Sequence, residues 1–156
     1  MNAIELLKQQ HREVEELFSK IEKGGEGPAR ERRALVAELT EKIKIHTNIE
    51  EKIFYPEGRQ ANEDLTLEAY VEHDVVSSLL RKISKTRLSD ENFDARITVL
   101  KELIEHHVQE EEQEYFPQCE KKLGNELLEE LGERMEAAVQ KLEGAPRKKR
   151  HLRVAA

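Results

Sequence analysis

Two segments of this 156-residue chain repeat one pattern of polar and aromatic residues, 61 positions apart. The first runs from His46 to Pro56 and reads HTNIEEKIFYP, and the second runs from His107 to Pro117 and reads HVQEEEQEYFP. Both fit H-x-x-x-E-E-x-x-aromatic-aromatic-P. A histidine and a glutamate four residues apart lie one turn apart on the same face of a helix. The repeat therefore predicts two helices that present matching His/Glu pairs.

A second repeated pattern lies upstream of each pair. His11 and His73 each begin H-x-x-x-x-x-L-x-x-K-I, a spacing that ends at Ile21 in the first copy and at Ile83 in the second. Each half of the chain thus carries one lone histidine followed by one His/Glu pair. The two halves read as two helical hairpins.

Apolar residues recur at alternating steps of three and four, which is the spacing of helices with one buried face. The predicted helices carry this spacing over residues 4–21, 36–53, 69–83 and 97–118, with a short fifth helix over about 125–142. Breaks are expected near Gly24–Pro28, Gly58–Asn62 and Arg87–Asp90. Pro56 and Gly58 should stop the second helix, and Pro117 should bend or end the fourth. Short connections favour an all-α, antiparallel up-down-up-down four-helix bundle with a C-terminal fifth helix.

Composition supports this fold class and limits the kinds of partner that we expect. Charged residues make up 38% of the chain and aromatic residues 4%, which suits solvated helices better than sheets. The net charge of −7 argues against a nucleic-acid partner. There is no long apolar run or signal-peptide pattern, and the one cysteine, Cys119, fits a reducing compartment. We expect a cytoplasmic domain over residues 1–143, without a membrane partner, and a disordered basic tail over 144–156.

Histidine and glutamate occupy helix positions where the spacing calls for Ile, Leu or Val. A single histidine at such a position is usually a hydrogen-bonded core residue, but this chain has six polar residues of this kind. Burying an ionised carboxylate costs several kcal/mol unless a counter-charge is present. No Lys or Arg shares these positions, so the pattern predicts a metal held by His11, His46, Glu50, His73, His107 and Glu111.

The donor set favours two transition-metal ions. Four imidazoles and two carboxylates exceed the needs of one tetrahedral zinc ion and are too rich in nitrogen for calcium or magnesium. Iron is the first choice, with manganese and zinc less favoured. In this arrangement His11 and His46 serve one ion, His73 and His107 serve the other, and the two glutamates bridge them. The Glu-x-x-His pattern of ferritin-type sites does not occur at these histidines.

The ordered layout H…HxxxE…H…HxxxE, with FYP and YFP after the two pairs, resembles the hemerythrin-like domains, also called HHE cation-binding domains. The resemblance covers about residues 1–121. It implies an antiparallel four-helix bundle around an oxo- or hydroxo-bridged pair of non-heme iron ions. It also implies chemistry with dioxygen, peroxide or nitric oxide, or iron sensing. Carried over by position, the four histidines are terminal ligands and the two glutamates are bridges.

The chain departs from the oxygen-carrying members of that family. Those proteins have a fifth histidine four residues after the one on the third helix, where this chain has Ser77. Their second bridging carboxylate stands five residues after its histidine, whereas Glu111 stands four after His107. Loss of the fifth imidazole should leave both ions with open positions. This favours peroxide reduction or disproportionation over oxygen storage.

Four further residues are candidates for the surroundings of the site. Glu15, one turn after His11, is a candidate additional ligand, although a solvated surface glutamate is the favoured alternative. Tyr70, Tyr55 and Tyr115 are candidate proton or hydrogen-bond donors to a bound oxidant, although core packing is the favoured reading of their spacing.

The predicted function is less specific than the predicted metal site. We expect a non-heme di-iron protein that binds small oxidants (hydrogen peroxide, dioxygen or nitric oxide) and reduces or disproportionates them, in the manner of a peroxidase or catalase. The alternative is a non-enzymatic iron or oxygen sensor, or an iron-binding regulatory module, that acts through a protein partner. A metal-free scaffold is the third interpretation. The sequence does not identify an electron donor.

Overall fold

A computed structural model describes residues 1–24 and 27–145, and this part of the chain is helical and contains no strand. Six stretches of α-helix and two π-helical turns follow one another along the chain. Their bounds are α1 (Ala3–Lys23), α2 (Ala29–Ile49), η1 (Glu50–Phe54), α3 (Tyr55–Gly58), α4 (Glu63–Ser84), α5 (Phe93–Glu110), η2 (Glu111–Tyr115) and α6 (Phe116–Glu143). Within the described residues, no helix is apolar over a length that could cross a bilayer.

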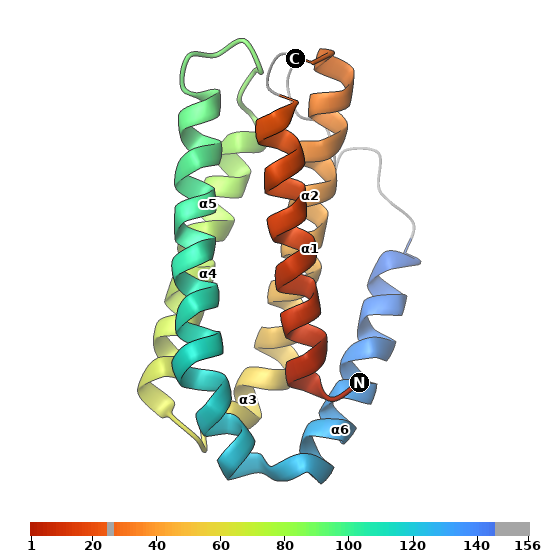
Figure 1. Cartoon of the computed structure of the whole chain (residues 1–156), viewed down its shortest axis with the longest axis vertical. Helices are drawn as coiled ribbons and strands as arrows, with labels where there is room; N and C mark the ends of the chain where they lie inside the picture. Colours follow the sequence, from red (N-terminus) through yellow and green to blue (C-terminus); the bar gives the residue numbers. More distant parts are fainter. Residues whose placement is uncertain (25–26, 146–156) are drawn as a thin grey trace.

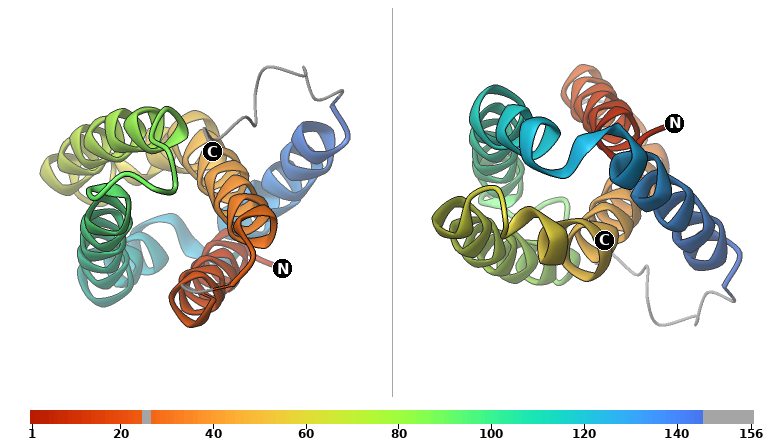
Figure 2. Two further views of the ribbon diagram at one scale, coloured as in Figure 1. Left: turned by 90° about the horizontal axis from the view of Figure 1, so that it is seen from above. Right: turned by 90° about the horizontal axis from the view of Figure 1, so that it is seen from below.

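The long helices form a bundle. Figure 1 shows α1, α2, α4 and α5 side by side along the long axis of the molecule, with α1 and α2, and likewise α4 and α5, running in opposite directions. Seen from either end, these helices stand at the corners of a four-sided arrangement (Figure 2). The predicted all-helical bundle is confirmed, and the break near Gly58–Asn62 lies between α3 and α4.

Local sequence signals fix where α1 and α4 begin. The side chain of Asn2 accepts a hydrogen bond from the backbone of Glu5, and the Glu5 carboxylate accepts one from the backbone of Asn2, which is a capping box. Asn62 caps α4 by accepting from the backbone N–H of Leu65. These caps satisfy amide groups that have no partner within the first turn of a helix.

The core is divided into two hydrophobic clusters. One includes Leu7, Ile49, Ala69 and Phe116, and the other includes Val14, Ile43, Val76 and Leu100. A buried histidine separates the members of the two clusters in α1, α2 and α4, and His107 lies between the α5 members of one cluster and Tyr115 of the other; the four histidines are His11, His46, His73 and His107. A polar layer therefore crosses the middle of the bundle between two apolar regions.

Both copies of the repeated motif contain a π-helical turn that begins at the motif glutamate. The amide of Tyr55 bonds to the carbonyl of Glu50, and the amide of Phe116 bonds to the carbonyl of Glu111, five residues back in each case. Pro56 and Pro117 then occupy the first turn of the next helix, where an amide donor is not needed. The second helix thus continues through η1 and α3 to Gly58, and Pro117 does not end the helical path.

The C-terminal part of the chain packs on α1 and α2. Gly124, with φ 78°, is a non-helical residue inside α6, and the segment after it corresponds to the predicted fifth helix. Leu128, Leu131 and Met135 of this segment are buried in the same cluster as Leu7. Figure 1 shows the segment beside α1 and α2, on the far side from α4 and α5. The predicted basic tail lies outside the described residues from position 146 onward.

Candidate metal centre

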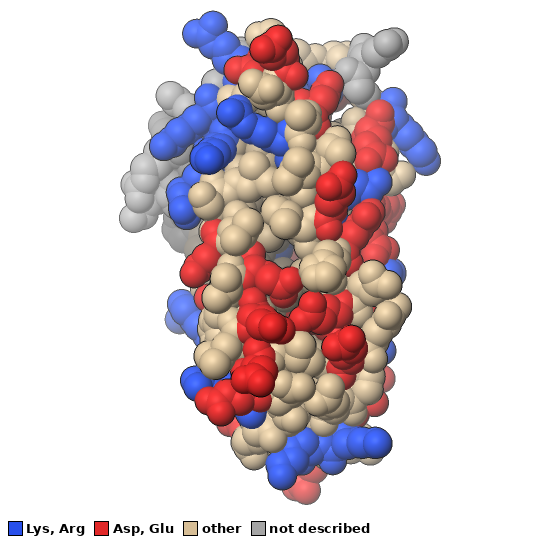
Figure 3. Space-filling view, turned by 90° about the vertical axis from the view of Figure 1, so that its left-hand side faces the viewer, with Lys and Arg blue, Asp and Glu red and all other residues tan. Residues whose placement is uncertain are grey.

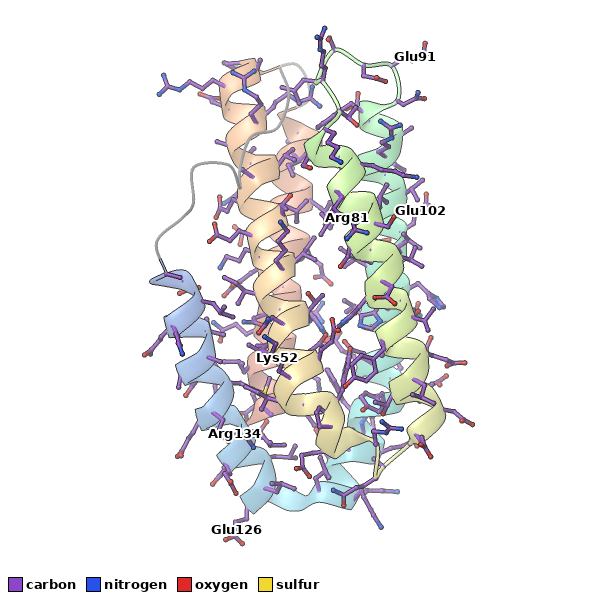
Figure 4. The ribbon with its side chains drawn as sticks, turned by 180° about the vertical axis from the view of Figure 1, so that it is seen from behind. Lys52, Arg81, Glu91, Glu102, Glu126 and Arg134 are labelled. Carbon is purple, nitrogen blue, oxygen red and sulfur yellow. The ribbon has the colours of Figure 1, made fainter. Side chains whose placement is uncertain are left out.

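Six polar side chains meet in the middle of the bundle. His11 comes from α1, His73 from α4 and His107 from α5, while His46 lies near the end of α2 and the two glutamates open the π turns. All six are buried, and Glu50 has 0% of its surface exposed. Figure 4 shows nitrogen- and oxygen-bearing side chains meeting between the helices at mid-height. The structure thus brings together all six residues that the sequence analysis named: His11, His46, Glu50, His73, His107 and Glu111.

The Nε2 atoms of the four histidines face the two carboxylates. Glu50 lies between the two hairpins, with Oε1 at 3.0 Å from His46 Nε2 and Oε2 at 3.0 Å from His73 Nε2. Glu111 Oε1 lies 3.3 Å from both His11 Nε2 and His107 Nε2. Each glutamate therefore contacts one histidine from each hairpin.

These donors form two groups with the spacing that a metal ion requires. Ligand atoms of His11, His46, Glu50 and Glu111 all lie within 4.8 Å of one another, and so do those of Glu50, His73 and His107. Several of the atoms lack a hydrogen-bond partner although they are fully buried, namely both ring nitrogens of His11 and one oxygen of each glutamate. Buried polar atoms are normally satisfied, so this set of nitrogen and oxygen donors fits a bound cation.

Without a metal, the histidines and glutamates compensate one another's charge. Burial alone would lower the pKa of His11, but contacts with the Glu111 and Glu112 carboxylates outweigh burial and raise the pKa to about 9. Burial would raise the pKa of Glu50, but His46 and His73 lower it well below the usual range. The cluster thus carries negative charge that either protons on the imidazoles or a metal can neutralise.

A second layer of side chains orients the imidazole rings through their Nδ1 atoms. His46 Nδ1 lies 2.7 Å from Gln10 Oε1, His73 Nδ1 lies 3.0 Å from Glu51 Oε2, and His107 Nδ1 lies 2.9 Å from Glu72 Oε1. The corresponding distance from His11 Nδ1 to Glu112 Oε1 is 3.6 Å, too long for a hydrogen bond. Acceptors at Nδ1 fix ring orientation and leave Nε2 available to a metal.

The repeat contained a signal for this second layer that the sequence analysis missed. Gln10 and Glu72 each directly precede a lone histidine and reach the paired histidine of the same hairpin. Glu51 and Glu112 each directly follow a motif glutamate and lie beside the lone histidine of the other hairpin. Both carboxylates are partly buried beside the cluster.

The two halves of the cluster differ in the aromatic residue beside them. The Tyr55 hydroxyl lies 2.8 Å from Glu111 Oε2, 3.0 Å from Glu50 Oε2, 3.1 Å from His73 Nε2 and 3.2 Å from His107 Nε2. Phe116, at the matching position of the second motif, instead stacks on His11 with ring centroids 6.0 Å apart. Tyr55 therefore lies inside the cluster, rather than around it as the sequence analysis suggested.

The other candidate residues lie away from the donors. The carboxylate of Glu15 pairs with Arg12 at 2.8 Å and its side chain is 44% exposed, so the structure separates it from the cluster. Tyr70 packs on the Tyr55 ring and donates to the Glu51 carbonyl, and the Tyr115 hydroxyl bonds to Thr66. Both tyrosines support the surroundings of the site without touching its donors.

A small cavity lies against the four imidazoles. Its walls are otherwise almost wholly apolar, and it encloses about 30 Å³, room for about two water-sized molecules. Apart from the histidines, the lining residues are Val14, Ile43, Thr47, Val76, Ile104 and Val108. The chemistry open to such a site is therefore that of a metal centre beside a dry pocket for a very small molecule.

Comparison with known proteins places this arrangement in a family. The model of the hemerythrin HHE cation-binding domain matches residues 2–119, which include all six clustered residues. This chain belongs to the hemerythrin HHE cation-binding family. Its His/Glu cluster is accordingly a site able to bind metal, and the resemblance inferred from the motif spacing is confirmed.

Similar proteins include one with a solved structure and two curated relatives. A crystal structure of an HHE cation-binding domain-containing protein from Mycobacterium kansasii has 33% identity and a TM-score of 0.80, covering 92% of this chain and 88% of that one. An uncharacterized protein of Mycobacterium tuberculosis is 30% identical over 149 residues, covering 94% of this chain and 90% of its own length. A protein described as a DNA nickase from Nostoc is 24% identical, but this HHE chain spans only 40% of it.

Proposed function

We propose that this chain holds two iron ions and uses them to disproportionate hydrogen peroxide. The observation that carries this proposal is the buried set of four imidazoles and two carboxylates, in which both glutamates reach histidines from both hairpins. His11 and His46 would serve one ion, His73 and His107 the other, and Glu50 and Glu111 would be shared. Imidazole combined with carboxylate suits iron.

When bound, a pair of iron ions supplies the chemistry of two-electron transfer to and from small oxidants. Disproportionation needs no outside reductant, because one peroxide loses two electrons to become O₂ and a second gains them, with two protons, to become two waters. Peroxide, dioxygen and nitric oxide are all small and uncharged, as the apolar cavity beside the imidazoles requires. The cavity is too small for an organic substrate of ordinary size.

The residues around the six proposed ligands orient the imidazole rings and keep a proton on a nearby hydroxyl. Gln10, Glu51 and Glu72 fix three of the imidazole rings through Nδ1. Burial, together with the charges of Glu111 and Glu50, raises the pKa of Tyr55 well above its usual value, so its hydroxyl keeps a proton in the metal-free protein. The Tyr55 oxygen is also close enough to the His73/His107 half to add a seventh donor there.

The test is anaerobic purification with metal analysis, followed by optical titration with dioxygen, peroxide and nitric oxide. We expect about two iron ions per chain and rapid peroxide loss with release of one O₂ for every two peroxides. A stable adduct with dioxygen and slow autoxidation would contradict the proposal and indicate an oxygen carrier. Iron binding that raises the melting temperature without peroxide turnover would instead favour a sensor.

A further inference from the structure

A second group of metal-binding side chains lies on the outer face of α4 and α5. Glu72 of α4 and His106 and Glu110 of α5 offer ligand atoms that all lie within 4.8 Å of one another. His106 Nε2 is 3.3 Å from Glu110 Oε2 and 3.8 Å from Glu72 Oε2. The His106 side chain is 69% exposed, so this group is open to solvent, unlike the buried cluster.

The group lines a surface hollow on that face. Its other lining residues are Leu67, Glu68 and Val71. Figure 3 shows Asp and Glu gathered around a hollow at mid-height of the face formed by α4 and α5, with Lys and Arg lying mainly toward the two ends. A concentration of one sign of charge around a hollow attracts cations and raises the rate at which they arrive.

The outer group is connected to the buried cluster in two ways. Glu72 belongs to both, because its Oε1 faces His107 Nδ1 at 2.9 Å while its Oε2 faces His106. A small internal cavity is lined by Glu72 and Glu110 together with His107 and Glu111. Glu111 is almost fully buried, and its Oε1 has no hydrogen-bond partner. A residue with an unsatisfied buried carboxylate oxygen therefore takes part in lining the cavity behind the outer group.

Among the residues that the structure describes, the first hairpin has no such outer group, although it is built from the same repeat. The positions that correspond to Glu72, His106 and Glu110 are Gln10, Ile45 and Ile49. The C-terminal segment of α6 packs on the first hairpin, on the side that faces away from α4 and α5 (Figure 1). The ligand set is thus particular to the hairpin whose outer face α6 does not cover.

We propose that Glu72, His106 and Glu110 form an outer divalent-cation site through which metal reaches the buried centre. An arriving cation binds in the hollow with oxygen and imidazole donors, and then moves inward past Glu72 to His107 and Glu111. The role in delivery rests on the proposed metal function of the buried cluster. The outer site itself rests only on the geometry of the α4/α5 face.

The test is the rate at which metal-free protein takes up cobalt(II), followed by the visible absorption of the ion as it enters the buried centre. His106→Ala and Glu110→Gln should each slow uptake about tenfold, with unchanged metal content at equilibrium. Glu102→Gln is the matched control, because it removes the same charge from the outer side of α5 (Figure 4). Uptake at the wild-type rate in both outer-site variants, or equal slowing by Glu102→Gln, would overturn the delivery route.

A titration with manganese(II) alone separates this proposal from the function of the buried centre. Protein whose centre has first been filled should bind one further manganese ion, counted by the loss of the free-ion electron paramagnetic resonance signal, and His106→Ala should abolish that binding. Absence of the extra ion in the wild type would refute the outer site. If no metal is retained in the buried centre but the outer ion is present, the proposed function fails and the outer site stands.

Discussion

The two halves of the buried cluster come from one repeated pattern yet are not chemically alike. In both halves the imidazole rings of a hairpin lie 4.9 Å apart at nearly the same angle, as the pairs His11–His46 and His73–His107 show. The first half is bordered by the Phe116 ring and the second contains the Tyr55 hydroxyl. The order Phe-Tyr in one motif and Tyr-Phe in the other accounts for this difference. Two aromatic residues in exchanged order are enough to make a near-symmetric site unequal.

Loss of a carboxylate that both halves share should have the largest effect. Glu50→Ala removes the group that contacts His46 and His73 at 3.0 Å each, so neither half keeps its donor set. We expect iron content to fall from about two ions per chain to below one, measured by metal analysis after dialysis. Glu120→Ala, an exposed position, is the control. Full iron content in Glu50→Ala would show that the halves do not share this residue.

Removal of the Tyr55 hydroxyl should make the two halves more alike. Tyr55→Phe keeps the buried ring but takes away the one polar atom that contacts both carboxylates and both imidazoles of the second half. Peroxide consumption per iron should fall about tenfold or more, because a positioned proton donor contributes at least that much. The measurement is the initial rate of O₂ release.

Phe116→Leu is the matching change in the first half. It removes the ring that stacks on His11 without touching a hydrogen bond, so the rate per iron should change less than about threefold. Equal losses of peroxide consumption per iron in Tyr55→Phe and Phe116→Leu would mean that the aromatic residues act only by packing. The difference between the two halves would then not affect the reaction.

The second-layer acceptors should have intermediate effects that differ between the halves. Glu51→Gln replaces a carboxylate that faces His73 Nδ1, and we expect metal affinity to fall about tenfold in competition with a chelator. Gln10→Glu places a carboxylate against His46 Nδ1 and should strengthen binding in the first half. Glu57→Gln serves as the control, because Glu57 bonds to Gln60 and to no histidine. Unchanged affinity in both variants would show that ring orientation does not depend on these contacts.

The smallest effect should come from Glu112. Its oxygen lies 3.6 Å from His11 Nδ1, and the same carboxylate pairs with Arg12, which is exposed. Glu112→Gln should therefore weaken metal binding only about twofold in the same chelator competition. A loss as large as that in Glu51→Gln would indicate that Glu112 moves onto His11 when metal is bound, which would remove one difference between the halves.

Residue spacing was sufficient to predict the bundle and the six clustered residues. Steps of three and four fix which face of a helix is buried, and a histidine on that face points inward whatever the exact length of the helix. The predicted fifth helix over 125–142 corresponds to the part of α6 that follows Gly124. These features depend on local periodicity, which a single sequence contains.

Spacing was not sufficient to predict the contact of a side chain that has more than one polar group within reach. Glu15 stands one turn after His11, but the adjacent Arg12 offers it a full positive charge at the surface, and its carboxylate pairs there. Tyr55 and Tyr115 both belong to the repeated motif, yet one hydroxyl joins the cluster and the other bonds to Thr66. The wide turns at Glu50 and Glu111 set which of the two buried aromatic residues in each motif lies beside the imidazoles, and no apolar periodicity marks these turns.

The π turns set the angular phase of everything that follows them. In a regular α-helix, Tyr55 would stand nine residues after His46, a rotation of about 900°, and would face the opposite side of the helix. One extra residue in the turn takes about 100° from that rotation and brings the aromatic back toward the histidine. The extra residue in the turn therefore changes which face of the helix the following aromatic residue occupies. Deleting a single residue, such as Lys52 in one copy or Gln113 in the other, would convert the wide turn to regular α-helix with eight residues from the histidine to the aromatic, again about 800°, so Tyr55 or Phe116 would keep its direction.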